Sequence, residues 1–495
     1  MAPPPAWQGM PTTGPVKMFV LLIRFSDMAE SNTQAEVDDK VFGDGNGNYP
    51  YESLKEFYTR SSYGLLTLQG ATLGWYNTGA ARSAIAETDA GREGLIEDAI
   101  DSFDAGGHDF SVYDNNGDGK IDYFAVIWTG PAGAWASFWW GYMTTWQNAA
   151  TPLGYTVDGK TLAGYSWQWE SSPSGGTFWP DTLIHETGHA LGLPDYYDYD
   201  DSVGPDGGVG GLDMMHSYGD HNAFSKWMLE WLAPANVPSG SLAVTLRPAA
   251  SYADAVKIMP SSDPSNAFEE YFMVQNRTQA GNDQGLPGSG LVIWHVDARL
   301  DGNGNDFLYD NSYAEHKLLR LMEADGLEEI ENNLDYADAG DFYASGKLFG
   351  SDSTPNSKKY DGTDTRVFVS DIAGTDDSRT LTCGTDYVEM PVKADLEAVR
   401  TYPNPARLSE GGQIRFVDIP YDAKDVKIQV FTVGGKLVRT LDESRGTVTM
   451  ANRAYKVGVW DGRNDSGEKV ASGVYMVVVR ASNKDAKKTK VGVFW

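Results

Sequence analysis

The stretch "HETGHALGLPDYYD", residues 185–198, guides the interpretation of the rest of the chain. His185 and His189 are four positions apart, so on a helix both imidazoles project from one face and can bind one ion. Glu186 follows the first histidine and can reach a water molecule on that ion. This HExxH spacing predicts that His185 and His189 bind zinc and that Glu186 is the general base. The alternative is a chance match to a short motif.

Zinc also needs a third protein ligand. In the longer pattern HExxHxxGxxH, the last ligand comes three positions after a glycine that turns the chain back under the metal. Gly192 occupies the glycine position and Asp195 occupies the last one. We therefore expect Asp195 to complete the site with a carboxylate oxygen at about 2.0–2.2 Å. The alternative is that Asp195 is only a turn residue after Pro194.

A methionine turn is expected beneath such a metal, and "GGLDMMHSYG", residues 210–219, offers Met214 and Met215. We predict that Met215 takes this place, although both methionines could be ordinary core residues. Tyr218 and His221 follow the turn and could stabilise an oxyanion or line a pocket. The sequence assigns neither residue to a role.

Composition limits the classes of function. The 495 residues are enough for two or three domains, and the formal net charge of −30 disfavours nucleic acid and anionic membranes as partners. No apolar run reaches the ~20 residues needed to span a bilayer. Cys383 is the only cysteine, which excludes internal disulfides and a thiolate metal cluster. The start, "MAPPPAWQGMPTTGP", lacks a basic segment followed by an apolar one, so no secretory signal is expected there.

Strand-like and helical patterns alternate before the motif. An apolar run at residues 16–27 predicts a strand covered on both faces, and "LLTLQGATLGW" predicts another. Helical spacing is found at residues 51–64 and at residues 83–103. We therefore predict a short leader at residues 1–15 and a mixed α/β domain at residues 16–232.

The remainder is predicted to be rich in β-structure. At residues 233–395, short strand patterns such as "EEYFMVQNR" and "GSGLVIWHVD" alternate with Gly, Asp and Asn turns, which indicates a second part of the same unit. At residues 396–495, alternating apolar and polar residues between turns predict a β-sandwich.

Loops rich in Asp and Asn suggest calcium. "DNNGDGKID" matches the start of an EF-hand-like loop. Positions 1, 3, 5 and 9 would offer the side chains of Asp114, Asn116, Asp118 and Asp122, and position 7 would offer the carbonyl of Lys120. Position 12 is Ala125 rather than Glu, so a further ligand would be needed. An Asx-rich turn before the next strand is the alternative. Two "DGNGN" stretches, residues 44–48 and 301–305, and the acids at 198, 200 and 201 leave the same two alternatives open.

The motif, "GLDMM", "AFSKWMLEWL" and "DNNGDGKIDYFAVIWTG" together resemble the immune inhibitor A family of secreted bacterial metallopeptidases. Further similar segments, in the same order, extend the resemblance over roughly residues 16–390. Two positions depart from the family pattern. In "GLDMM" the acidic residue is not preceded by the Trp that is common in the family, and "VQNR" has Gln where Glu is expected before Asn. The last hundred residues resemble the flagellar hook-cap Ig-like domain and type IX secretion sorting domains, although the ending "KVGVFW" puts a sorting role in doubt.

The resemblance implies a metzincin-like α/β (α+β) zincin domain with a β-rich extension and an all-β Ig-like sandwich. It further implies a secreted bacterial zinc endopeptidase that acts on extracellular proteins or peptides and is made with an inhibitory propeptide, which this chain lacks. We expect a monomer with one catalytic zinc and one or more structural calcium ions. Two rival hypotheses remain: an inactive extracellular calcium-binding or adhesion protein, and a zinc hydrolase of non-protein amides.

Overall fold

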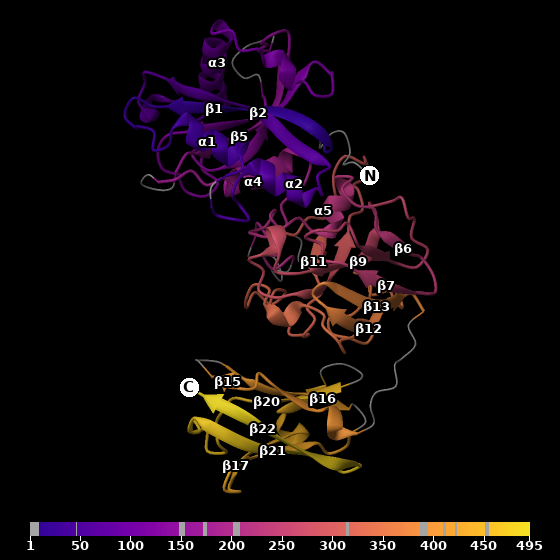
Figure 1. Cartoon of the computed structure of the whole chain (residues 1–495). Coiled ribbons are helices and arrows are strands. Elements are labelled where there is room, and N and C mark those ends of the chain that lie inside the picture. The colour runs from indigo at the N-terminus through magenta and orange to yellow at the C-terminus, as the bar shows by residue number, and fades with distance from the viewer. Residues whose placement is uncertain are drawn as a thin grey trace.

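The computed structural model describes residues 9–45, 47–147, 154–171, 176–200, 208–312, 316–386, 395–408, 412–420, 423–450 and 455–495. Three parts follow one another along the chain (Figure 1). A mixed α/β region comes first, a region with two further sheets follows, and an all-β domain ends the chain. The predicted alternation of strands and helices before the motif is confirmed in outline.

The first region is built on a sheet of five strands in the order β2-β1-β3-β5-β4. Parallel pairing joins β2, β1, β3 and β5, whereas β4 pairs antiparallel with β5 at the edge. The strands are β1 Gly14–Arg24, β2 Leu66–Asn77, β3 Lys120–Trp128, β4 Tyr142–Thr145 and β5 Thr161–Trp169.

The central strand β1 is covered on both faces, as its continuous apolar run predicts. Val20 and Leu22 belong to the core on the face that also holds the motif helix. Phe19 and Leu21 belong to the core on the opposite face, which contacts the long helix α3. Because neighbouring strand residues point to opposite faces, a run of this kind serves two cores at once.

The α-helices of the first two regions are α1 Gln34–Val41, α2 Leu54–Ser61, α3 Asp89–Ala105, α4 Asp181–Ala190 and α5 Ala223–Met228. The start predicted for the third of these, at Ser83, is wrong. A 3₁₀ turn occupies Arg82–Ala84, and the α-helix begins only after Thr88. The Thr88 side chain accepts a hydrogen bond from the Gly91 amide at 3.1 Å, which caps the helix at this point.

Two sheets form the middle region. One has the order β11-β10-β9-β8-β6 and the other the order β12-β13-β7. Their strands are β6 Ala235–Val237, β7 Ser241–Leu246, β8 Val256–Ile258, β9 Glu270–Arg277, β10 Gly290–Asp297, β11 Leu319–Leu321, β12 Phe368–Thr375 and β13 Ser378–Gly384. One buried core runs from Met10 through the motif helix to Cys383, so the first two regions share an interior.

The C-terminal domain packs two antiparallel sheets around its own core, which includes Phe416, Trp460 and Val477. Its sheets have the orders β14-β16-β20-β19 and β15-β22-β21-β17-β18, and only β15 pairs in parallel among the described strands of this domain. The strands are β14 Arg400–Tyr402, β15 Ala406–Arg407, β16 Ile414–Pro420, β17 Lys427–Thr432, β18 Leu437–Asp442, β19 Val448–Met450, β20 Tyr455–Trp460, β21 Gly473–Ala481 and β22 Lys484–Phe494.

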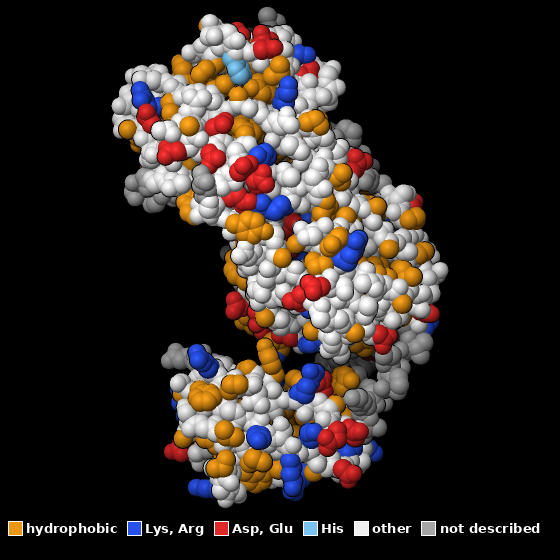
Figure 2. Space-filling model, viewed as in Figure 1, with side chains coloured by type: hydrophobic (Ala, Val, Ile, Leu, Met, Phe, Trp, Pro, Cys, Tyr) orange, Lys and Arg blue, Asp and Glu red, His pale blue; other side chains and the backbone are white. Residues whose placement is uncertain are grey.

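Charge differs between the regions. Residues 396–495 carry 17 Lys and Arg against 11 Asp and Glu, whereas the whole chain has a net charge of −30. Figure 2 shows basic side chains interspersed with acidic ones over the visible face of the C-terminal domain. Within the described residues, no helix is long and apolar enough to cross a membrane.

Candidate metal centre

The motif helix α4 is held between the sheet and the rest of the core. Leu183, Ile184 and Thr187 are fully buried, and the hydroxyl of Tyr58 on α2 donates a hydrogen bond to the Ile184 carbonyl at 2.7 Å. The opposite side of the helix carries His185 and His189, whose side chains are 19% and 22% exposed. Solvent can therefore reach the predicted metal ligands.

Beyond the helix, the chain turns back at Gly192. Its φ of 102° lies in the region that favours glycine, which explains why glycine occupies this position. The turn brings Asp195 Oδ1 to 3.0 Å from His185 Nε2 and 3.4 Å from His189 Nε2. The structure thus brings the three predicted ligands together.

Each imidazole is oriented through its other nitrogen. His185 Nδ1 lies 2.8 Å from the Met214 carbonyl, and His189 Nδ1 lies 2.8 Å from the Leu193 carbonyl. A carbonyl only accepts hydrogen bonds, so in both rings Nδ1 carries the proton and donates it. Nε2 of each ring consequently faces Asp195 and carries the lone pair when the ring is neutral. Backbone partners of this kind fix the tautomer and orientation of metal-binding histidines.

The resulting arrangement fits a metal ion. Two bare Nε2 atoms and a carboxylate oxygen face one another, and Asp195 Oδ1 is buried without a hydrogen-bond partner. Three acceptors in contact repel unless a cation lies between them. With zinc–ligand distances of about 2.0–2.1 Å, a tetrahedral site separates its ligand atoms by about 3.3 Å, close to the separations found here. The donor set of two imidazoles and a carboxylate is also one that zinc accepts.

Electrostatics also favour a cation at this place. Burial alone would lower the pKa of His189, but the Asp195 carboxylate raises it to about 9. Burial would raise the pKa of Asp195, yet the two histidines outweigh this effect and hold that pKa well below its usual range. A site that stabilises positive charge on the imidazoles stabilises a cation between the same atoms.

Glu186 has the environment of a proton carrier. Its side chain is buried on α4, and burial raises the pKa of its carboxyl group while the charges of His189 and His185 lower it. A carboxyl group whose pKa is moved toward neutrality can accept and return a proton efficiently near pH 7.

The predicted methionine turn passes directly behind the motif helix. Met215 is fully buried, and a methyl group at Gly188 would collide with its sulfur atom. The preceding residue, Met214, supplies the carbonyl that orients His185. Met215 therefore packs against the helix that carries the two histidines.

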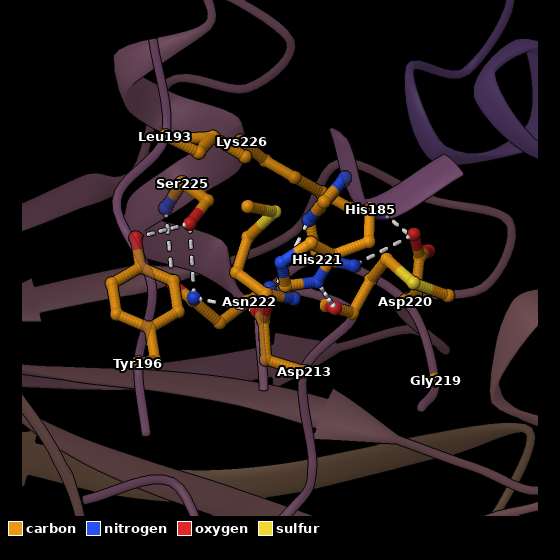
Figure 3. A network of polar contacts seen from close by, with 12 residues as sticks. His185, Leu193, Tyr196, Asp213, Gly219, Asp220, His221, Asn222, Ser225 and Lys226 are labelled. Carbon is orange, nitrogen blue, oxygen red and sulfur yellow. Dashed lines mark hydrogen bonds and ion pairs between the residues drawn. The ribbon is translucent and has the colours of Figure 1, made fainter. Parts of the chain in front are cut away.

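Asp213 organises this turn, and its role was not predicted from the sequence. The carboxylate accepts hydrogen bonds from the Met215 amide at 2.8 Å and from the Asn222 amide at 2.6 Å. Figure 3 shows Asp213 among Asn222, Ser225 and Tyr196, which connect the turn to the start of α5. Only its position beside two methionines in "LDMM" signalled a buried acid.

Tyr199 is a second residue that the sequence did not reveal. Its hydroxyl donates a hydrogen bond to Asp195 Oδ2, the carboxylate oxygen that does not face the histidines. By contrast, His221 is fully buried among Phe57, Tyr58 and Trp231. Within the described residues, neither His221 nor the half-buried Tyr218 forms a hydrogen bond or ion pair with the three predicted ligands.

A cleft of about 590 Å³ lies between the first two regions. Its lining includes Tyr197, which lies two residues after Asp195 in the chain. The lining also includes His216, which directly follows Met215. Its rim carries exposed apolar side chains: Trp135, Leu334 and Tyr336 are 62%, 72% and 59% exposed. The cleft therefore comes close in sequence to Asp195 and to the methionine turn, and its rim is apolar.

The EF-hand-like loop folds around its acids. Asp114, Asp118 and Asp122 each place an oxygen within 4.8 Å of the others. Asp114 accepts hydrogen bonds from the amides of Gly117 and Gly119, and its Oδ2 also lies 2.7 Å from Lys160 Nζ. An internal ammonium thus neutralises one carboxylate of the predicted calcium site.

The remaining predicted ligands of this loop make local bonds. Asn116 Oδ1 accepts from the Asp118 amide at 2.8 Å, and Asp118 Oδ1 accepts from the Lys120 amide at 2.9 Å. Such bonds are typical of Asx turns. They are compatible with both interpretations of the loop, and calcium binding here stays a prediction.

The other acidic stretches show local contacts as well. Asp301 Oδ1 accepts from the amides of Asn303 and Asn305. Asp44 lies 3.1 Å from Lys55, and Asp198 lies 3.5 Å from Lys317. Positions 46 and 201 lie outside the described residues.

Comparisons with known proteins identify two parts of the chain. Residues 405–485 match the model of the FlgD Ig-like domain. Immune inhibitor A of Bacillus thuringiensis subsp. alesti is 26% identical over 230 residues, a match that covers 37% of this chain and 34% of the relative. The chain thus spans about a third of the length of this curated relative.

Two solved structures from Porphyromonas gingivalis are similar over parts of the chain. Dimeric latent PorU is 22% identical, covers 19% of this chain and 9% of its own, and has a TM-score of 0.15. PorZ, a surface component of the type-IX secretion system, is 13% identical, covers 49% of this chain and 37% of its own, and has a TM-score of 0.17. Both resemblances predicted from the sequence are confirmed: over 37% of its length the chain is a distant homologue of immune inhibitor A, and it carries a FlgD Ig-like domain at residues 405–485.

Proposed function

We propose that this protein is a zinc-dependent endopeptidase of the metzincin-like type. The observation that carries the proposal is the convergence of His185 Nε2, His189 Nε2 and Asp195 Oδ1, with both Nδ1 atoms bound to backbone carbonyls. The homology to immune inhibitor A supports the same conclusion.

The proposed mechanism divides the work among the residues of the centre. A zinc ion bound by the three ligands would supply a Lewis acid and lower the pKa of a water molecule. Glu186 accepts a proton from the attacking water and returns it to the amide nitrogen of the leaving group. The carbonyls of Met214 and Leu193 hold the two imidazoles, so that the ligands keep their orientation throughout.

Polypeptides are the proposed substrates. The cleft lined by Tyr197 and His216 is open, and its exposed apolar rim suits apolar side chains of a polypeptide. The Ig-like domain and the homology to immune inhibitor A support action outside the cell or at its surface. We propose a monomeric, extracellular enzyme made with an inhibitory propeptide.

Two rival functions differ in what they predict. An inactive calcium-binding or adhesion protein would not need a buried Glu186 whose pKa is raised beside two histidines. A zinc hydrolase of non-protein amides would need the same centre. Only the open cleft with its exposed apolar rim disfavours this alternative. The two rivals are separated from the proposal by assays of protein cleavage and of small-amide cleavage.

Casein hydrolysis by the full chain tests the proposal. We expect cleavage by the native protein, loss of cleavage with a zinc chelator, and its return when zinc is added back. Glu186→Ala should lower activity by about 10² to 10⁴, the usual effect of losing acid–base catalysis.

The matched control is Asp104→Ala, which removes an exposed carboxylate near the end of α3 and should leave cleavage unchanged. An active Glu186→Ala variant would rule out the proposed role of this residue. A native protein that contains zinc and cleaves small amides but not casein would favour the non-protein hydrolase.

A further inference from the structure

A second cluster of acids lies in the middle region, away from the motif helix in sequence. Glu323, Asp325, Glu329 and Asp341 each place a carboxylate oxygen within 4.8 Å of the others. They come from the chain that follows β11 and from the 3₁₀ helix η4, Ala339–Asp341. The backbone joins these two segments, because the Ala324 amide donates to the Asp341 carbonyl at 3.2 Å.

Two of the four carboxylates are deeply buried. Glu323 is 0% exposed and Asp341 is 3% exposed. One oxygen of each is satisfied: Glu323 Oε2 accepts from the Glu329 amide at 2.7 Å, and Asp341 Oδ2 accepts from the Asp338 amide at 2.8 Å. The other two oxygens, Glu323 Oε1 and Asp341 Oδ1, are buried without any hydrogen-bond partner.

Such an arrangement is costly unless a cation neutralises it. A buried carboxylate needs a partner of opposite charge or a full set of hydrogen bonds. Within the described part of the chain, no Lys, Arg or His forms an ion pair with any of the four carboxylates. The nearby Lys347 donates its hydrogen bond to the Ala324 carbonyl instead.

The local backbone is shaped to let these carboxylates approach. A Cβ atom at Gly340 would lie only 2.7 Å from Asp325 Oδ2, so a larger residue there would displace this carboxylate. Asp325 and Glu329 are partly exposed, which gives an ion and its water molecules access from one side. The cluster is therefore closed at Glu323 and Asp341 and open at the other two acids.

We propose that Glu323, Asp325, Glu329 and Asp341 form a structural calcium site. The donors are all oxygen atoms, which are the ligands of hard cations rather than of zinc or copper. Calcium accepts six to eight oxygens in flexible geometry, including carboxylates that bind through one or both oxygens, whereas magnesium needs a near-ideal octahedron. This site is separate from the predicted zinc centre and does not depend on peptidase activity.

The pKa shifts agree with this geometry. Burial, together with the charge of Asp341, raises the pKa of Glu323 to about 8. Burial likewise raises the pKa of Asp341 to about 7. Without a metal ion, these groups take up protons; a calcium ion would replace the protons and leave all four groups ionised.

Calcium titration of the full chain by calorimetry, after removal of divalent ions, tests the site. We expect Glu323→Gln and Asp341→Asn each to bind one calcium ion fewer than the native chain, and the variants as purified should contain as much zinc as the native chain. Without calcium, both variants should melt no lower than the native chain, because each replaces a carboxyl group whose charged form is destabilised by burial. Asp377→Asn, at an exposed position between β12 and β13, is the matched control and should bind calcium like the native chain.

A further variant separates this site from the EF-hand-like loop. Asp118→Asn changes only that loop. If both sites bind calcium, the double variant Asp118→Asn with Glu323→Gln should lose the sum of the calcium lost in the two single variants. Should Glu323→Gln fail to fold, Glu329→Gln, at the partly exposed side, should still weaken binding of one calcium ion. Unchanged calcium stoichiometry and affinity in the folded variants of this cluster would overturn the proposal.

Discussion

Asp195 has two oxygen atoms in different surroundings. Oδ1 faces the two imidazoles, and Oδ2 accepts the hydrogen bond from Tyr199. A hydrogen bond to the outer oxygen of a metal-binding carboxylate fixes its rotation and leaves the inner oxygen directed at the metal. Tyr199 is therefore expected to position Asp195 without being a ligand itself.

Removal of this hydroxyl should weaken zinc binding. Tyr199→Phe is expected to lower zinc affinity by about 10- to 100-fold, the usual effect of losing such a partner. Competition with a chelator of known affinity measures the change. The control is Tyr252→Phe, because Tyr252 is also an exposed tyrosine, at 42%, and lies outside the centre. Equal zinc affinity in Tyr199→Phe and the native chain would refute the positioning role.

The ligands themselves could be predicted because they are local in sequence. The spacing from His185 to His189 requires only a helix, and Gly192 signals the turn that returns Asp195. Tyr199 could not be predicted in the same way, because its hydroxyl reaches Asp195 only through the path of the chain after the turn. Asp213 was missed for a related reason, since its partners Met215 and Asn222 lie on both sides of a bend.

Among the secondary-structure elements, the strands were predicted more accurately than the helix boundaries. The apolar run at 16–27 lies largely within β1, Gly14–Arg24, because burial on both faces leaves a direct composition signal. Helical spacing at residues 83–103 gave no sign that Thr88 would cap the helix and displace its start to Asp89. The cluster around Glu323 had no sequence pattern, because η4 brings Asp341 back from a distant position.

The stability of the calcium-free chain should fall as the pH rises through the range in which Glu323 and Asp341 lose their protons. The pKa of Glu323 is raised from 4.5 to about 8, and that of Asp341 from 3.8 to about 7. Between pH 4 and 8 these two groups thus bind more protons in the folded chain than in the unfolded chain, so their contribution to the free energy of unfolding decreases with pH. The charged groups that act on the pair or its neighbours are Asp325, Glu329, Asp338, Lys347 and Arg415.

Calcium should reverse this dependence by keeping the carboxylates ionised. Urea unfolding at several pH values, with calcium and with a calcium chelator, measures both trends. We expect the stabilisation by calcium to increase from pH 5 to pH 8. A stabilisation that does not change with pH would contradict the assigned titration.

Over the whole molecule, the described chain has separate interiors. The motif helix and the two middle sheets share one core, whereas the C-terminal domain has its own around Trp460. Local patterns predicted the strands of both parts, but not that the first core would extend from Met10 to Cys383. A shared core depends on contacts between distant segments, which composition and periodicity do not record.

The separate core predicts that the Ig-like domain unfolds on its own. Scanning calorimetry of the full chain should give at least two transitions, and calcium should raise only the one that belongs to residues 9–386. A chain that ends at residue 386 should keep the calcium-sensitive transition and lose the other. A single transition in the full chain, with no folded protein after truncation, would show that the two parts form one cooperative unit.

Zinc content per chain, measured by elemental analysis of Asp195→Ala and Glu186→Ala side by side, tests the metal centre most directly. Asp195→Ala removes a ligand, whereas Glu186→Ala removes the proton acceptor and no ligand. We predict one zinc ion per chain in the native protein and in Glu186→Ala, and much less in Asp195→Ala. One zinc ion per chain in Asp195→Ala would contradict the prediction, because the third ligand would then be another residue.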